Sequence, residues 1–176
     1  MKNIICFSGK QYSGKDTAAK LVLEAFPSFI RIGIADAIKL EFGKRNNLTF
    51  EEIEANKEKY RTGLIELGNE GRNIHPDFWL NKIIEQDKNV IVPDVRLIHE
   101  AEVFKAAGAI LIRVEASFET RSKRGIITNT NDLTEIELDN YNGFDYVLNN
   151  DGDFEELKKN ILPLIDFLKE KIIQLR

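Results

Sequence analysis

The 176-residue sequence predicts an α/β fold in which a five-stranded parallel sheet carries helices on both faces. Short apolar runs alternate with helical segments along the chain, and each run is apolar at successive positions rather than at every second one. This continuous pattern is typical of parallel strands, because helices cover both sides of the sheet that they form. A chain of this length suffices for one hydrophobic core, so a single domain is expected.

Five apolar runs are the candidates for strands. Glycine, proline or clusters of polar residues bound them, which is where strands normally end. The predicted strands are residues 2–8, 29–35, 89–94, 109–115 and 144–151.

The segments between these runs predict helices. Thr49 followed by Glu52 has the spacing of a capping box, Pro76 suits a first helical turn, and Pro163 predicts a bend in the last helix. The stretch from about residue 36 to 86 contains no strand candidate and is interpreted as an insertion within the domain. The predicted helices are residues 14–26, 37–45, 49–72, 76–86, 97–108 and 153–174.

Composition limits the classes of partner. The net charge of −4 gives no basic field of the kind that nucleic-acid binding usually requires. No run approaches the length of a membrane span, and no signal peptide is visible at the start. The single cysteine, Cys6, lies in an apolar run and is interpreted as a core residue in a reducing compartment. We therefore expect a cytoplasmic protein with a small-molecule ligand, either a monomer or a homodimer, without nucleic-acid or membrane partners.

The segment "GKQYSGK" matches the spacing G-x-x-x-x-G-K and lies between the first predicted strand and the first predicted helix. Glycines in such a loop let backbone N–H groups surround phosphate oxygens, and the lysine reaches the outer phosphates. The positive end of the following helix favours the same anion. The sequence therefore predicts an ATP-phosphate site made by Gly9, Lys10, Ser13, Gly14 and Lys15; the alternative is an ordinary strand-to-helix turn.

Asp16 stands where such loops usually carry serine or threonine. A carboxylate is a good ligand for Mg²⁺, and next to a triphosphate its negative charge would be unfavourable without a metal. We therefore expect dependence on Mg²⁺, with Thr17 supplying a hydroxyl to a nearer phosphate. Asp94, at the end of the third predicted strand, is the second candidate metal ligand, and a helix N-cap is the alternative for it.

Four segments resemble known kinases. "FSGKQYSGKDTAA" resembles the opening of the phage and bacterial deoxynucleoside monophosphate kinases and, equally, that of the animal-type phosphomevalonate kinases. "YRTGLIELGNEGRNIHPDFWLNKI" is similar to the acceptor-binding segment of both families, and "VPDVRLIHEAEVFKAAGAILIRV" is more similar to the deoxynucleotide kinases. "RSKRGI" followed by "LDNYNGFDYVLNND" is spaced more like phosphomevalonate kinase. The resemblance implies a P-loop NTPase fold of the nucleoside monophosphate kinase type.

Cations near the insertion predict binding of an anionic acceptor. Lys39, Arg61 and Arg72 lie on or beside its helices, and Arg96 follows the third strand. Cations at the carboxyl ends of parallel strands suit an acceptor phosphate, although most helix charges are simply solvated. Trp79 is a candidate wall of the acceptor pocket, with a core position as its alternative.

Residues 117–132 are predicted to form a mobile lid. Arg121 and Arg124 lie one turn apart on one face of a short predicted helix there. Arginines on a lid stabilise the charge of a transferring phosphoryl group and exclude water, so both are assigned catalytic roles together with Lys15 and Asp94. In relatives of this fold the turn after the fifth strand contacts adenine and ribose, which predicts that role for Asn150 and Gly152.

These observations predict transfer of the γ-phosphoryl group of ATP, with Mg²⁺, to the phosphate of a small phosphomonoester. A deoxynucleoside monophosphate is the favoured acceptor and phosphomevalonate the close alternative. A nucleotide-binding switch or regulatory module without an acceptor is the alternative of another class.

Overall fold

The computed structural model describes residues 2–174. The described chain contains a parallel sheet with the strand order β2-β3-β1-β4-β5. Strand β1 is central, with Ile5 opposite Ile91 of β3 on one side and Ile110 of β4 on the other. The strands are β1 (Ile4–Ser8), β2 (Phe29–Arg31), β3 (Asn89–Val95), β4 (Ile110–Glu115) and β5 (Tyr146–Asn149).

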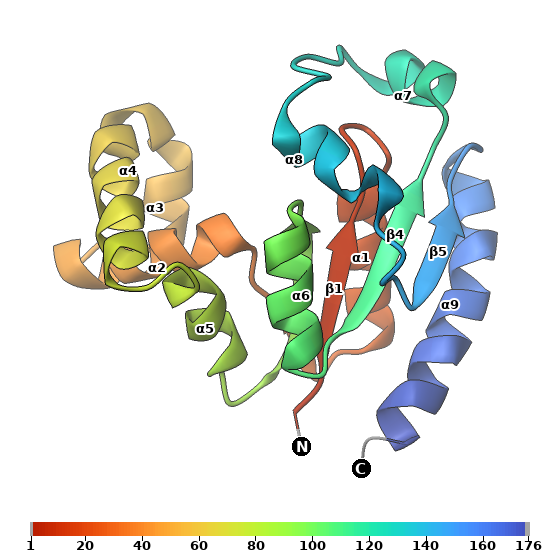
Figure 1. The fold of residues 1–176 in the computed structure, drawn as a ribbon, viewed down its shortest axis with the longest axis horizontal. Helices are drawn as coiled ribbons and strands as arrows, with labels where there is room; N and C mark the ends of the chain where they lie inside the picture. Colours follow the sequence, from red (N-terminus) through yellow and green to blue (C-terminus); the bar gives the residue numbers. More distant parts are fainter. Residues whose placement is uncertain (1, 175–176) are drawn as a thin grey trace. The chain divides into compact units, whose positions relative to one another are not determined.

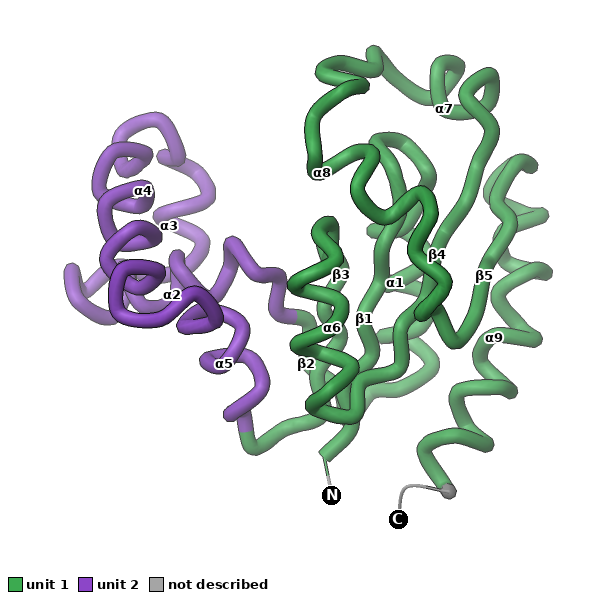
Figure 2. Tube along the Cα trace, viewed as in Figure 1, with its two compact units in different colours: residues 1–31, 87–176 green, residues 32–86 purple. Residues whose placement is uncertain are grey.

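The chain divides into two compact units, shown in Figure 2. Unit 1 comprises Met1–Arg31 and Asp87–Arg176, and it holds the whole sheet. Unit 2 is the continuous segment Ile32–Gln86 and is helical. It covers the stretch that the sequence marks as an insertion, and the acceptor-binding role of that stretch stays a prediction.

In unit 1, helices lie on both faces of the sheet (Figure 1). α1 (Lys15–Ala25) and α9 (Phe154–Gln174) pack together on one face, and α6 (Ile98–Ala106) lies on the other. Alternate residues of β1 follow this division, because Ile5 and Phe7 join the core under α1 and α9 while Cys6 points to the opposite side. The fold class predicted from the sequence is therefore confirmed.

Unit 2 packs four helices around its own small core. They are α2 (Ile34–Asn46), α3 (Phe50–Ala55), α4 (Lys57–Ile74) and α5 (Phe78–Ile84). The indole of Trp79 is 3% exposed, and its Nε1–H donates to the carbonyl of Gly68 at 2.9 Å. Gly71 allows this close approach, because a Cβ there would lie 2.6 Å from Trp79 Nε1.

Two elements predicted between residues 29 and 72 differ from the structure. The second strand ends at Arg31 rather than at residue 35, because the N–H of Gly33 donates to Asp36 Oδ2 at 2.9 Å and α2 already begins at Ile34. The helix predicted over residues 49–72 is interrupted at Asn56, which leaves helical geometry between α3 and α4. The capping box at Thr49 and Glu52 is confirmed, with distances of 3.1 Å and 2.7 Å for its two hydrogen bonds.

The other differences lie at element ends and in the polar segment after the predicted lid. α5 begins at Phe78, so Pro76 precedes the helix instead of lying in its first turn. The fifth strand is limited to Tyr146–Asn149. The polar segment after α7 (Phe118–Arg124) contains α8 (Leu133–Ile136) and the 3₁₀ helix η1 (Glu137–Asn140), neither of which was predicted. As predicted, the last helix, α9, continues through Pro163, and the bend there stays a prediction.

Within residues 2–174, no helix combines the length and the apolar composition needed to cross a bilayer.

The buried position of Cys6 predicts an unreactive thiol. Cys6 is 1% exposed, and burial, reinforced by the carboxylates of Asp94 and Glu100, raises its pKa well above the usual value. Alkylation requires the thiolate, so we expect iodoacetamide at pH 8 to modify the native protein at least about tenfold more slowly than the unfolded protein. Mass spectrometry over time measures both rates, and the denatured sample is the control. Equal rates would contradict the core position of Cys6.

Candidate active site

The phosphate loop joins β1 to α1 and depends on two glycines. Gly14 has φ +89°, and a Cβ there would lie 2.2 Å from Nδ2 of Asn150. At Gly9 a Cβ would lie 2.4 Å from Ser13 Oγ and 2.6 Å from the Val114 carbonyl. The backbone therefore approaches its neighbours at distances that only glycine allows, as the phosphate-loop interpretation requires.

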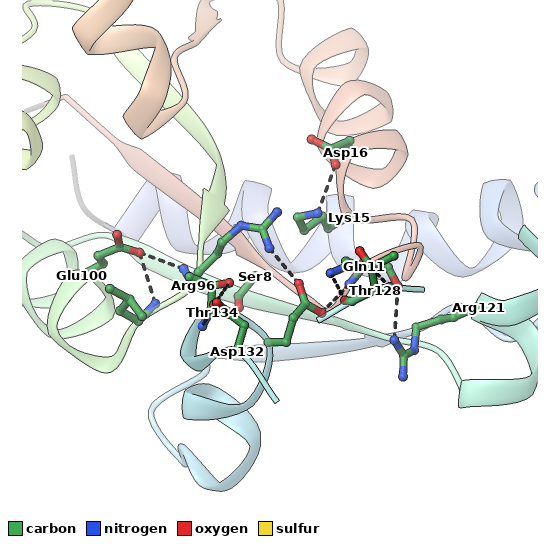
Figure 3. Close-up of polar contacts among 12 residues, drawn as sticks. Ser8, Gln11, Lys15, Asp16, Arg96, Glu100, Arg121, Thr128, Asp132 and Thr134 are labelled. Carbon is green, nitrogen blue, oxygen red and sulfur yellow. Dashed lines mark hydrogen bonds and ion pairs between the residues drawn. The ribbon is translucent and has the colours of Figure 1, made fainter. Parts of the chain in front are cut away.

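Lys15 and Asp16 begin α1, and their side chains meet (Figure 3). Lys15 Nζ lies 3.2 Å from Asp16 Oδ2, and Arg31 approaches Oδ1 of the same carboxylate at 3.7 Å. The side chain of Lys15 is buried, whereas that of Asp16 is 63% exposed. A pocket of about 440 Å³ in unit 1 is lined by Lys15, Asp16, Thr17, Arg96 and Arg124, together with loop residues.

Oxygen ligands suited to Mg²⁺ are present in this pocket. The exposed Asp16 carboxylate and the Thr17 hydroxyl are of the hard type that Mg²⁺ prefers, so the residues fit the metal. Among the described residues, no group of three or more acidic, histidine or cysteine side chains could hold a metal ion.

Asp94 lies inside β3, two residues before Arg96. The alternative role as an N-cap of α6 is wrong, because the cap position is Leu97 and the capping carboxylate is that of Glu100. Glu100 Oε2 accepts from the N–H groups of Arg96 at 2.8 Å and Leu97 at 3.1 Å. Burial raises the pKa of Glu100 even though these two donors favour the charged form. Asp94 does not line the pocket of Lys15.

Lys10 and Ser13 do not line that pocket. Lys10 Nζ lies 2.6 Å from Asp139 Oδ2, and Arg113 Nη2 lies 3.2 Å from the other oxygen of Asp139. Ser13 Oγ is buried and has no hydrogen-bond partner among the described residues. Both residues line a second pocket of unit 1, beside Arg113 and Arg121. Their predicted contact with ATP stays a prediction, and their backbone groups belong to the loop.

The two arginines of the predicted lid contact the phosphate loop. Arg121 is buried in α7, and its Nη1 donates to the carbonyl of Gln11 at 3.3 Å. Arg124 Nη1 donates to the carbonyls of Tyr12 and Ser13, each at 3.3 Å. The structure brings both arginines to the loop, where their donors meet carbonyl oxygens.

The turn after β5 lies against the same loop. Asn150 Nδ2 donates to the carbonyl of Ser13 at 2.8 Å. Arg124 Nη2 donates to the carbonyls of Asn150 at 2.8 Å and Gly152 at 2.7 Å. Asn150 and Gly152 also line a small pocket of about 190 Å³ with Gly14 and Thr17. Their predicted contact with adenine and ribose stays a prediction.

Unit 2 has a pocket of its own, of about 480 Å³. Its walls carry the cations Lys39, Lys57, Arg61 and Arg72 and the aliphatic residues Ala35, Ile38, Leu64 and Ile65. Lys39 is already paired with Glu54 at 2.6 Å and Asp36 at 3.0 Å. Although burial opposes the charge, these two carboxylates raise the pKa of Lys39.

Trp79 does not line this pocket. Its indole is buried in the core of unit 2, so the core interpretation replaces its predicted place in an acceptor wall.

Two residues of the site were missed from the sequence. Gln11 of the phosphate loop forms hydrogen bonds with Thr128 and Arg121. Glu135 of α8 is a buried carboxylate that accepts from the backbone N–H of Gln11. Gln11 occupies one of the variable positions of G-x-x-x-x-G-K, so spacing alone gives it no weight. Glu135 lies in a polar segment where an acidic residue is ordinarily solvated.

Comparison with protein families places this chain in a known group. A family model described as phosphomevalonate kinase matches residues 7–109, and one described as deoxynucleotide monophosphate kinase matches residues 71–161. Each match covers more than half of the chain. The chain belongs to the group of phosphomevalonate and deoxynucleotide monophosphate kinases.

Two viral proteins are similar to this kinase in sequence. The "Uncharacterized protein ORF76" of Ictalurid herpesvirus 1 (strain Auburn) is 28% identical over 170 residues, which cover 88% of this chain and 64% of that protein. The kinase therefore spans less than two thirds of the herpesvirus protein. The "Putative deoxynucleotide monophosphate kinase" of Acanthamoeba polyphaga mimivirus is 24% identical over 193 residues, covering 93% of this chain and 96% of that protein.

Solved structures share the fold of the kinase. Dephospho-CoA kinase from Campylobacter jejuni has a TM-score of 0.59 at 15% identity and covers 97% of this chain and 98% of its own. Gluconokinase from Sinorhizobium meliloti gives 0.56 at 15% identity, with coverage of 99% and 97%. Shikimate kinase from Aquifex aeolicus gives 0.53 at 19% identity, with coverage of 94% and 98%.

The constraint at Gly14 predicts a severe effect of a single methyl group. In Gly14→Ala the new Cβ meets Asn150 and the positive φ is strained, so the loop must shift. We expect ATP affinity, measured by isothermal titration calorimetry, to fall at least about tenfold, equivalent to about 1.4 kcal/mol.

Gly108→Ala is the matched control. Gly108 also has a positive φ, +82°, but a Cβ there would meet no atom within 4 Å. We expect this variant to lose about 1–2 kcal/mol of unfolding free energy through backbone strain while keeping its ATP affinity. Equal ATP affinities for the two variants would contradict the fit of Gly14 against Asn150.

Proposed function

We propose that the kinase transfers the γ-phosphoryl group of ATP to the phosphate of a deoxynucleoside monophosphate, giving the diphosphate. The observation that carries this proposal is the pocket of unit 1, where Lys15, Asp16 and Thr17 face the two arginines Arg96 and Arg124. The match to the deoxynucleotide monophosphate kinase model and the similarity to the mimivirus protein support the acceptor class.

The residues of the loop suit the donor. The Lys15 ammonium and the N–H groups at the start of α1 would hold the outer phosphates of ATP. Asp16, with Asp94 as a second candidate, would hold Mg²⁺, which neutralises charge on the transferring group when bound. An acceptor phosphate is already anionic, so the transfer needs no residue to remove a proton.

The lid arginines must exchange partners during the reaction. Arg121 and Arg124 donate to backbone carbonyls of the loop, at distances of 3.3 Å. Phosphate oxygens are stronger acceptors than carbonyls, because the hydrogen bond is then charge-assisted on both sides. A bound triphosphate would therefore draw both guanidinium groups toward the transferring phosphoryl group, where they would stabilise its charge.

Phosphomevalonate is the second candidate acceptor, and the pocket of unit 2 favours it. Among the described residues, the lining of that pocket is mostly aliphatic and cationic, with Glu58 as its one acidic residue, and it includes no aromatic side chain on which a base could stack. A small aliphatic molecule with two anionic groups suits four cations and an aliphatic wall. The phosphomevalonate kinase model, which matches residues 7–109, supports the same candidate.

A substrate panel tests the proposal. Purified protein with ATP and Mg²⁺ is given each nucleoside and deoxynucleoside monophosphate and, separately, phosphomevalonate, and the diphosphate product is measured by chromatography. We expect turnover of one or more deoxynucleotides. Turnover of phosphomevalonate alone would establish the second candidate. ATP binding without turnover of any acceptor would favour a nucleotide-binding switch and overturn the proposal.

Removal of a lid guanidinium tests the role of α7. We expect Arg121→Ala to lower kcat about 100-fold or more, because a donor to the transferring group is lost, and to change ATP affinity much less. Lys123→Ala is the control. Lys123 lies on the same helix, and among the described residues its ammonium is paired with Glu119 rather than with the phosphate loop. Thermal unfolding shows whether both variants fold. Equal losses of kcat and ATP affinity would contradict a lid role.

A further inference from the structure

Glu135 is a buried carboxylate beside a site for anions. It lies in α8, which follows the predicted lid (Figure 1). Its side chain is 4% exposed. A negative charge there opposes the binding of phosphate groups by Coulomb repulsion. A buried carboxylate is also costly unless its oxygens are well paired. Both effects work against an acidic residue at this position, so its contacts must compensate for them.

Each oxygen of Glu135 has a separate partner. Oε1 lies 2.9 Å from Nη1 of Arg96, at the end of β3. Oε2 accepts from the backbone N–H of Gln11 in the phosphate loop, also at 2.9 Å. One rigid carboxyl group therefore joins the arginine that we propose as an acceptor anchor to the loop that we propose as the donor site.

The rest of Gln11 is bound to the same part of the chain. Its side-chain amide pairs with the backbone of Thr128, with Nε2 donating to the carbonyl at 2.8 Å and Oε1 accepting from the N–H at 3.2 Å (Figure 3). Its carbonyl accepts from Arg121. The loop at Gln11 is thus held against residues 121–135 through its backbone and its side chain, and Glu135 extends this network to Arg96.

We propose that Glu135 is a positioning residue that fixes the guanidinium of Arg96 relative to the phosphate loop. This inference rests on the proposed function, because Arg96 must bind the acceptor phosphate for its position to matter. A free arginine side chain has many rotamers, and pairing one Nη with a buried carboxylate removes much of that freedom before the acceptor binds. Arg96 also lines the pocket that contains Lys15, so a fixed guanidinium would be held at that pocket.

The test uses Glu135→Gln in the full-length kinase, with the best acceptor from the panel. The amide oxygen can still accept from Gln11, but the amide NH₂ is a donor and cannot pair with Arg96. We expect KM for the acceptor to rise about tenfold, while KM for ATP changes less than about twofold. Glu137→Gln is the matched control, because Glu137 accepts from the N–H of Ile98 and, within residues 2–174, forms no hydrogen bond or ion pair with Arg96 or Gln11. This control should keep both constants.

A double-variant cycle shows whether Glu135 acts through Arg96. If it does, Arg96→Ala and Arg96→Ala/Glu135→Gln should have the same acceptor KM, because the second change has nothing left to position. Losses that add in the double variant would overturn the inference, as would an unchanged acceptor KM in Glu135→Gln or in Arg96→Ala. If wild-type protein turns over no acceptor, the proposed function itself fails, which is a distinct result.

Folding is monitored by thermal unfolding of every variant. If Glu135→Gln does not fold, Glu135→Asp replaces it, because the charge is kept but the side chain is one methylene shorter and cannot reach both partners. The same rise in acceptor KM, without a rise in the KM for ATP, is then expected. Equal rises in both constants would point to general damage of the loop and would overturn the positioning role.

Discussion

The candidate active site depends on the position of β1 between two parallel neighbours. Because β3 and β4 run parallel to β1 on either side, all three strands end at one edge of the sheet. The phosphate loop leaves β1 at that edge, Arg96 follows β3, and the segment that carries α7 follows β4. Residues 9, 96 and 121 are far apart in the sequence, and the strand order alone brings their segments together. The same order places the turn after β5 against the loop.

Several cations around the phosphate loop in unit 1 are paired with carboxylates. Lys10 and Arg113 share Asp139, Lys15 meets Asp16, and Arg96 meets Glu135. Unpaired cations packed around a small loop would repel one another, so these carboxylates stabilise the arrangement. Phosphate groups can replace an exposed partner such as Asp16 far more easily than a buried one such as Glu135. The exposed Asp16 is therefore a contact that a ligand can replace, whereas the buried Glu135 is a contact that keeps the conformation of the loop.

Continuous apolar runs were enough to predict five strands and their parallel arrangement, because burial of both faces has a direct signature in the sequence. The phosphate loop could also be predicted, because its glycine spacing reflects a requirement for a positive φ and close backbone approach, which the structure shows at Gly14. Strand ends were less predictable: "FIRIGIA" is apolar throughout, yet the bond from Gly33 to Asp36 starts a helix within it. Side-chain direction was beyond the sequence, as Lys10 and Trp79 show, because it depends on partners distant in the chain. α8 and the role of Glu135 could not be predicted either, because Glu135 lies in a polar segment and its partners, Gln11 and Arg96, are distant in the sequence.

Unit 2 is one uninterrupted segment, Ile32–Gln86, with a core of its own. The chain leaves the sheet after β2 and returns to it at β3, so no residue of the phosphate loop or of α7 lies within this segment. A contiguous block of this kind can be exchanged between related genes by two recombination events without disturbing the sheet. Under the proposed function, acceptor preference could diverge in evolution through this block while the donor machinery stayed the same.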